Sequence, residues 1–556
     1  MRFEFPIIVL VVLALAVRPS DAEVRLDRLF PSGAQRDSTL EVEFTGEFPE
    51  WPVSVWVSRP GVEFSPLSEA GDSRRLLSQV SADAELGIYW VRVFNASGAS
   101  ALRPFIVGNA KETIEQEPNN SLSDSQRDPY EATKNKSIVF NGRLAKSGDV
   151  DMFSIQAEAG DYLVADVDAR DPLGSDVDIV MQLVSPDGFV VAHNDDQQSL
   201  DPRITFRVPK TGRWHVRLFG FPATPNSTIR FAGSDSYIYR LFVTTGPTLN
   251  YSLPLAVQSE GETRLKLFGW NLTESDREHV ILPRSGSSET VFAISDTSQP
   301  LRIPVVPRPV VVEPEAHDET IPVDLPVTIT GRIETAGNRD CYEIQLRSKE
   351  SMIARLESRE LGFPLDGVLE IEDPQGKSLK RVDDTNSTRD VEVDFTATDD
   401  GIVRVCVEDL HGNGGDDFVY RLTLTPTTPS FKTTTSEHQV IVKAGASVEI
   451  PVQITRQHNH QDVIRLMADG LPAGIQVDEA TSEADKDSAK EVKLNLTASE
   501  DAAPYSGPIR LVANDNKQRS YVAIPLSLAS ERQHEIWLTV TPPEKDPEKE
   551  PGNDAE

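Results

Sequence analysis

The chain of 556 residues is poor in basic side chains. It carries 55 Lys and Arg against 88 Asp and Glu, which gives a formal net charge of −33. Nucleic acids and anionic lipid surfaces are bound through Lys and Arg, so this deficit predicts that neither is a partner. Most of the acidic groups are expected on a solvated surface, where they favour solubility and the binding of cations.

Cysteine is also scarce, because Cys341 and Cys406 are the two cysteines of the chain. Each lies in a strand-like run of the same predicted domain. In an exported protein this arrangement predicts a disulfide between them. Two buried free thiols are the alternative that the sequence leaves open.

Long apolar runs are missing except at the N-terminus. Residues 5–17 form an apolar stretch after Arg2, and Ser20 and Ala22 place small residues at a cleavage site. This pattern predicts a signal peptide over residues 1–22, because the apolar run is short for a membrane span. A retained anchor is the alternative. We expect a secreted, periplasmic or cell-surface protein with no membrane insertion after signal cleavage.

The sequence also lacks the common catalytic motifs. It has no Gly-x-Ser-x-Gly elbow and no phosphate-binding loop, and the His534-Glu535 pair lacks the second His of a zinc-protease helix. His458 and His460 could be two metal ligands, but no carboxylate or Cys cluster of known spacing accompanies them, so a loop or edge position is predicted there. We therefore predict that the protein is not an enzyme.

Short alternating segments dominate what is present. Residues 39–44, 89–94 and 214–219 place apolar side chains on one face at period two. The chain has 39 Pro and 33 Gly, which separate such segments by turns. This pattern predicts an all-β protein of tandem β-sandwich modules, jelly-roll-like and immunoglobulin-like.

Two internal repeats support the modular prediction. Pairs that recur 188 or 189 positions apart are Gly142 and Gly331, Asp151 and Asp340, and Asp196 and Asp384. Pairs that recur 223 positions apart are Pro31 and Pro254, Gln35 and Gln258, and Gly46 and Gly269. The predicted unit is therefore a small module followed by a larger one, and it occurs twice.

The predicted organisation has seven parts. In order these are the signal peptide (1–22), an immunoglobulin-like module (23–108), a larger β-sandwich (109–246), an immunoglobulin-like module (247–306), a second larger β-sandwich (307–427), an immunoglobulin-like module (428–541) and an acidic tail (542–556). The tail has almost no apolar side chains, so it is predicted to be disordered.

The larger modules resemble a known family. In the first, the segments at 115–120, 147–153, 185–188, 194–196 and 211–214 are similar to motifs of the bacterial pre-peptidase C-terminal (PPC) domain. The second module matches more weakly where residues 313–316 replace the opening motif. The resemblance implies two jelly-roll-like sandwiches of a kind appended to secreted proteases and other exported proteins. Family members in collagenases bind collagen and hold calcium at the opening segment.

That opening segment contains the best candidate site. Glu115 and Glu117 are two residues apart, as are Asp149 and Asp151 on the strand that the resemblance places beside it. An extended backbone puts residues two apart on the same side, and calcium takes six to eight oxygen ligands. The predicted ligands, with two Asn amides, are Glu115, Glu117, Asn119, Asn120, Asp149 and Asp151. The alternative is an acidic linker with an Asn turn.

These observations predict an exported, non-catalytic protein for extracellular or cell-surface binding or adhesion. The expected partner is a matrix protein or a polysaccharide, and calcium is the possible cofactor. Trp51, Trp56 and Trp270 are candidates for a binding platform or, alternatively, for module cores and seams. A structural spacer or envelope scaffold and an accessory subunit of a secreted hydrolase are the alternative functions.

Overall fold

The computed structural model describes residues 24–67, 74–131, 137–197, 200–224, 230–294, 299–314, 320–383, 390–526 and 532–543. These residues are mostly in β-strands, which confirms the all-β tandem sandwich prediction. The predicted signal peptide and residues 544–556 of the predicted tail lie outside the described residues. In the described part of the chain, no helix is long and apolar enough to cross a membrane.

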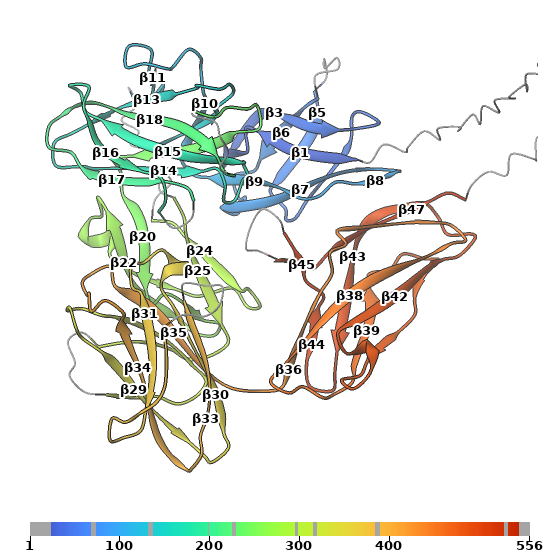
Figure 1. Cartoon of the computed structure of the whole chain (residues 1–556). Helices are drawn as coiled ribbons and strands as arrows, with labels where there is room; N and C mark the ends of the chain where they lie inside the picture. The colour runs from blue at the N-terminus through green and yellow to red at the C-terminus, as the bar shows by residue number, and fades with distance from the viewer. Residues whose placement is uncertain are drawn as a thin grey trace, which may run out of the picture.

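Five modules follow one another along the chain (Figure 1). Module 1 packs two sheets, whose strands are β1 (Arg25–Phe30), β3 (Ser38–Glu47), β6 (Arg75–Val80) and β5 (Val62–Pro66), and β2 (Gly33–Gln35), β9 (Arg103–Gly108), β7 (Gly87–Asn95) and β4 (Ser54–Val57), with β8 (Gly98–Ala99) paired to β7. Module 3 has two smaller sheets, β20 (Thr248–Leu253), β22 (Thr263–Trp270) and β23 (Glu278–Ile281), and β21 (Val257–Gln258), β25 (Leu301–Val306) and β24 (Glu289–Phe292). A 3-10 helix, η2, spans Glu274–Asp276.

Modules 2 and 4 have the same strand order. In module 2 the sheets are β10 (Lys111–Ile114), β12 (Ser137–Arg143), β19 (Ile238–Thr244), β14 (Tyr162–Asp168) and β17 (Arg203–Arg207), and β11 (Gln126–Arg127), β13 (Asp151–Ala157), β18 (Gly212–Pro222), β15 (Val177–Val184) and β16 (Val190–Asn194). In module 4 they are β26 (Val310–Val312), β28 (Val327–Arg332), β35 (Val419–Pro426), β30 (Ser351–Glu357) and β33 (Val391–Thr396), and β27 (Ile321–Pro322), β29 (Asp340–Leu346), β34 (Gly401–Asp409), β31 (Gly367–Glu372) and β32 (Ser378–Val382). Helix η3 spans Arg359–Leu361.

Module 5 is a further sandwich. Its strands are β36 (Ser430–Thr434), β38 (Ser447–Gln457), β42 (Glu491–Ala498) and β40 (Ile475–Val477), and β37 (Gln439–Lys443), β47 (Ile536–Thr541), β43 (Tyr505–Asn514), β39 (Ile464–Asp469) and β41 (Ala480–Ser482), with β44 (Arg519–Tyr521) on β43 and a small pair β45 (Ile524–Pro525) and β46 (Arg532–Gln533). Helix η4 spans Asp487–Ala489.

Alternation in the sequence explains these sandwiches. Along β15, Val177, Ile179 and Met181 are fully buried, while the intervening residues are partly exposed. Successive side chains of a strand point to opposite faces, so one face supplies the core and the other meets solvent. Each of the five modules encloses its own cluster of such residues.

An arginine joins the two modules of each unit. In the first unit Arg240 of β19 pairs with Glu112, and its guanidinium lies so close to Gly33 of module 1 that a Cβ there would be 2.8 Å from it. In the second unit Arg421 of β35 pairs with Glu357 at 2.9 Å and faces Leu255 of module 3. Arg240 and Arg421 hold the same register position, so the junction itself is repeated.

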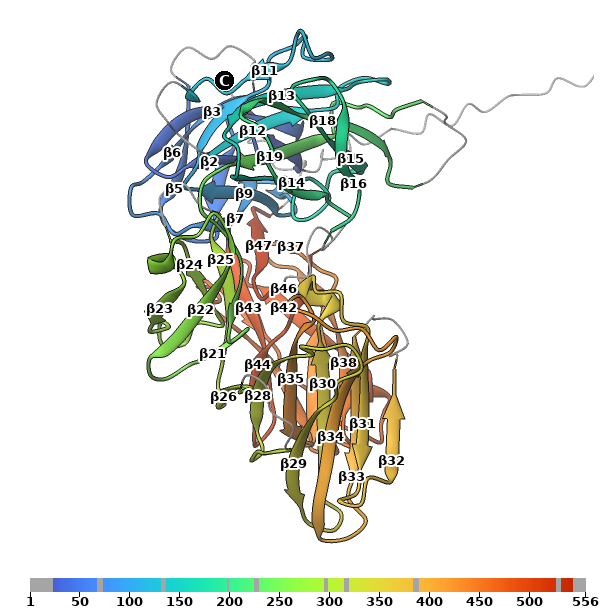
Figure 2. The ribbon, with the colours of Figure 1, turned by 90° about the vertical axis from the view of Figure 1, so that its left-hand side faces the viewer.

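Module 5 returns to module 1. Trp537 of β47 packs against Phe94 (4.7 Å between ring centroids) and Trp56 (6.0 Å), and Arg92 lies over its ring. Arg92 also donates to the carbonyl oxygen of His438 at 3.0 Å. Figures 1 and 2 both show β47 beneath β7, so the chain closes on itself. We call this contact the Trp537 seam.

Candidate metal centre

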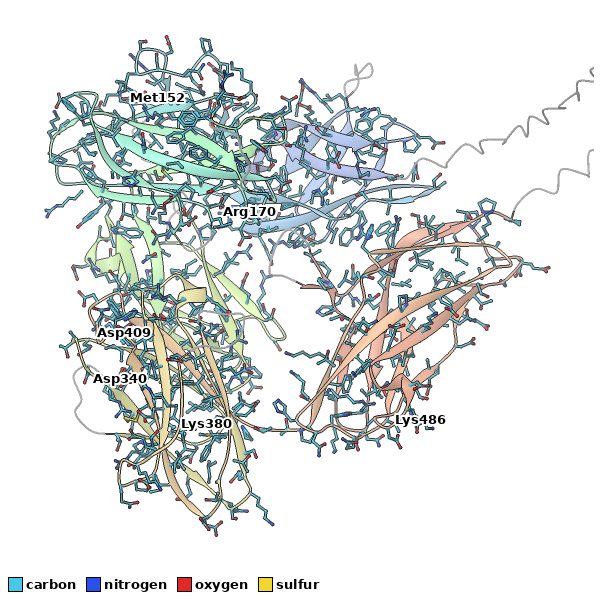
Figure 3. All side chains as sticks on the ribbon, in the orientation of Figure 1. Met152, Arg170, Asp340, Lys380, Asp409 and Lys486 are labelled. Atoms are coloured by element: carbon cyan, nitrogen blue, oxygen red, sulfur yellow. A yellow bond between two sulfur atoms is a disulfide. The ribbon has the colours of Figure 1, made fainter. Side chains whose placement is uncertain are left out.

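The segment that opens module 2 is attached to both of its sheets. After β10, the backbone N–H of Glu115 donates to Asn141 of β12 at 2.9 Å. Four residues later, the carbonyl oxygen of buried Asn119 accepts from the N–H of Met152 in β13 at 3.0 Å, close to the position labelled in Figure 3. The segment therefore spans the end of the sandwich and carries its acidic side chains across it.

Carboxylates gather beneath this segment. The oxygens of Glu117, Asp149 and Asp151 lie within 4.8 Å of one another, and both aspartates are almost fully buried. The Tyr239 hydroxyl donates to Asp151 at 2.5 Å and to Glu115 at 3.3 Å. The arrangement thus brings together all four acids named in the sequence prediction.

Burial and neighbouring charge raise the pKa values of two of these acids, Asp151 and Glu115. Burial, followed by the charge of Glu115, raises the pKa of Asp151 to about 9. Burial also raises the pKa of Glu115 to about 7, and the charges of Glu117 and Asp149 add to the increase. Carboxylates that are buried together resist full ionisation unless a positive charge is present. Here either bound protons or a bound cation would neutralise the negative charge of the group.

Two further observations fit a cation. The Oδ2 atom of Asp149 accepts from the N–H of Ala145 at 2.8 Å, whereas its Oδ1 atom is buried with no hydrogen-bond partner among the described residues. The Asn119 amide lies 3.2 Å from Glu117 and from Asp151, and it donates two hydrogen bonds if its nitrogen faces them. With an ion bound, the amide oxygen could face the group instead and add an oxygen of a kind that calcium takes.

The sixth predicted ligand is placed differently. Asn120 is exposed, whereas its neighbour Asn119 is fully buried. Successive residues of an extended segment point to opposite sides, so the two amides cannot both face the carboxylates. The structure thus gathers five of the six predicted residues.

In module 4, tyrosine hydroxyl groups donate hydrogen bonds to the corresponding acids, Glu313 and Asp340. Tyr420 donates to Asp340 at 2.8 Å, Tyr342 donates to Glu313 at 3.0 Å, and the two hydroxyls are 2.7 Å apart. Asn338 stands where module 2 has Asp149, and Tyr342 stands where it has Phe153. This second group, near Asp340 in Figure 3, therefore has fewer charges and more donors, and Glu315 lies outside the described residues.

The disulfide prediction is confirmed. Cys341 of β29 and Cys406 of β34 are direct cross-strand partners and are bonded, with Cα atoms 4.1 Å apart. Cys406 is fully buried. The bond joins two central strands of module 4, so the alternative of two free thiols is wrong for this structure.

The remaining candidate side chains have other roles. Trp51 packs against Phe48 beside the core of module 1, and Trp56 belongs to the Trp537 seam. His460 accepts from Arg456 at one ring nitrogen (2.8 Å) and meets Asp515 at the other (2.7 Å). Both ring nitrogens are therefore occupied by the chain itself, and this group anchors a loop.

Comparison with known proteins identifies one of the modules. Residues 149–220 match the family model of the bacterial pre-peptidase C-terminal domain. The chain contains a pre-peptidase C-terminal domain. The PPC match lies within module 2, and module 4 shares its strand order.

Individual proteins are similar over limited parts. A probable subtilase-type serine protease of Deinococcus radiodurans is 32% identical over 102 residues, which are 18% of this chain and 14% of that protein's length. The pre-peptidase C-terminal domain of a Bacillus anthracis collagenase is 14% identical over 20% of this chain and 100% of that one, with a TM-score of 0.17. A Bacteroides ovatus glucan-utilisation protein, SGBP-B, is 10% identical over 71% of this chain and 72% of that one, with a TM-score of 0.15.

Proposed function

We propose that the protein is an exported, non-catalytic array that binds an extracellular protein or polysaccharide. The repeated two-module unit is the observation that carries this proposal, because both the strand order and the arginine junction recur. Repeated modules on one chain raise the effective concentration of weak binding faces. The PPC domain is a non-catalytic type of domain, which agrees with this role.

A binding array of extracellular polysaccharides and matrix proteins tests the proposal. The full chain without its predicted signal peptide is applied with calcium and, separately, with chelator. We expect retention on at least one class of ligand. Silence on every ligand contradicts the binding proposal and favours a spacer or envelope scaffold.

We also propose that the acids of module 2 hold a calcium ion. Glu115, Glu117, Asp149 and Asp151, with the Asn119 amide oxygen, would be its ligands. Lys146 is 3.9 Å from Asp149, so the four acids have one long ion pair, and the ion would supply further positive charge in a structural role. It would bind in exchange for protons, since two of the acids have raised pKa values.

Arg143 shows what such a site would stabilise. Its backbone N–H donates to Glu115 at 2.8 Å, while its guanidinium pairs with Glu43 of module 1 at 2.9 Å and lies 3.7 Å from the centre of the Phe30 ring. A bound ion would fix Glu115 and, through Arg143, the angle between modules 1 and 2. The expected consequence is a stiffer first unit.

A further inference from the structure

A groove lies where modules 2, 3 and 4 meet. Its first part has a volume of about 460 Å³ and is lined by Arg203 of β17, Asn250 of β20, Trp270 of β22 and Arg359 of η3, with Phe363 beside them. An adjoining hollow of about 360 Å³ shares Arg203, Asn250 and Phe363. The shared residues make the two hollows one continuous groove.

Contacts across the module boundaries hold the groove open in one shape. Tyr251 of module 3 stacks on Phe268 (4.6 Å) and meets the edge of Phe363 in module 4 (5.1 Å). Arg203 of module 2 donates to the amide oxygen of Asn250 at 3.3 Å. The polar walls are therefore fixed before a ligand arrives, as in most small-molecule sites.

Arg359 is positioned by its backbone. The carboxylate of Asp390 accepts the N–H groups of Ser358, Arg359 and Glu360 at 2.9 to 3.0 Å. The Arg359 side chain is 33% exposed, and among the described residues its ion pair with Asp366 is long, at 3.9 Å. Its Nε atom is buried without a hydrogen-bond partner among the described residues, so a ligand would meet the outer nitrogens of the guanidinium. The guanidinium thus retains capacity for an anion.

The charged side chains of the groove lining also favour an anionic ligand. The charged residues along the groove are Arg203, Arg302, Arg359, Arg421, Glu360 and Asp417. Arg203, Arg302 and Arg421 are already paired with Asp166, Glu289 and Glu357, so Arg359 is the most weakly paired arginine of the lining. In a chain of net charge −33, a weakly paired arginine in a groove favours an anionic ligand.

We propose that this groove binds an oligosaccharide that carries carboxylate groups. A sugar ring packs on Trp270, its carboxylate pairs with Arg359, and its hydroxyls bond to the Asn250 amide. Arginine forms paired hydrogen bonds to a carboxylate, and aromatic rings supply an apolar surface with a defined geometry. This inference rests on the proposed binding function and names its ligand class.

Calorimetric titration of the full chain with tetragalacturonate tests the groove. We expect Trp270→Ala and Arg359→Gln each to weaken binding by about tenfold or more, since a charged hydrogen bond is lost or an aromatic surface is removed. Arg170→Gln is the matched control, because Asp201 anchors the Arg170 backbone in module 2 as Asp390 anchors Arg359. Arg170, labelled in Figure 3, is outside the groove lining, and its variant should bind like the wild type. The neutral methyl ester of the tetrasaccharide should bind at least about tenfold more weakly than the acid.

Each contrary result overturns the inference in a different way. Binding that is equal in the Trp270, Arg359 and Arg170 variants places the site elsewhere while the binding function stands. Equal binding of the methyl ester rules out recognition of the carboxylate. No binding of tetragalacturonate by the wild type at millimolar concentration overturns the groove proposal, and the ligand array then decides the broader function. Arg359→Gln leaves the Asp390 anchor in place, so it remains informative if Trp270→Ala fails to fold.

Discussion

Replacing Asp149 by Asn and Phe153 by Tyr would give module 2 the two side chains that module 4 carries as Asn338 and Tyr342. The first change removes a buried carboxylate whose Oδ1 atom has no hydrogen-bond partner among the described residues and only a long ion pair with Lys146, at 3.9 Å. The second adds a hydroxyl beside the Tyr239 ring, which lies 6.4 Å from the Phe153 ring. We expect the Asp149→Asn/Phe153→Tyr variant to be stable without calcium and insensitive to it.

The expected effect of calcium on the wild type follows from linkage. At one hundred times its Kd, a ligand that binds only the folded state stabilises it by about 2.7 kcal/mol. For a module of this size that corresponds to about 8 °C in Tm. The double variant loses one charge and gains a hydrogen bond worth about 1 kcal/mol, so its Tm in calcium and in chelator should agree within about 1 °C.

Scanning calorimetry of the full chain measures this difference, because one of several transitions should move with calcium. Asp195→Asn is the control, since Asp195 is exposed and its change removes the same charge. This control should keep the wild-type shift. The reasoning would be refuted if calcium did not change the Tm of the wild type, or if it raised the Tm of the double variant as much as that of the wild type.

Three more predictions follow from particular contacts. In chelator, the free energy of unfolding of module 2 should fall as the pH rises from about 4 to 9, because Glu115 and Asp151 keep protons in the folded state that they lose on unfolding. Calorimetry at a series of pH values measures this free energy, and a rise with pH would contradict the prediction. Replacing Cys341 and Cys406 together by Ala should lower the stability of module 4 by about 4 kcal/mol, because the disulfide closes a loop with a sequence separation of 65. Urea unfolding should show a lower midpoint for this variant, and an unchanged midpoint would contradict the prediction. Trp537→Ala should lower the stabilising free energy of the Trp537 seam by about 3 kcal/mol and release module 5 from module 1. Small-angle scattering should then show a larger radius of gyration, whereas an identical profile would mean that other contacts hold module 5.

Local patterns in the sequence predicted much of the fold. Alternation along strands such as β15 and β38 indicates one buried face, and the spacing of turns indicates sandwiches. The pairing of Cys341 with Cys406 was also predictable, since each lies in an alternating run of one domain. Such features depend on neighbours in the chain, which the sequence shows directly.

Distant contacts were beyond local patterns. Tyr239 reaches Asp151 from 88 residues away, across the two sheets that contain β19 and β13. The outward direction of Asn120 depends on how the opening segment crosses the sandwich. The Trp537 seam joins residues more than 400 positions apart, and no periodicity in either module indicates it. The groove at Trp270 likewise depends on how three modules meet.

The central claim is that these modules bind a ligand without transforming it. The most direct measurement incubates the full chain with the ligands that it retains on the array, and then compares the size of each recovered ligand with that of the input. The account predicts retention with unchanged ligand length. Shortened ligands would contradict it, because they would show that the chain is a hydrolase.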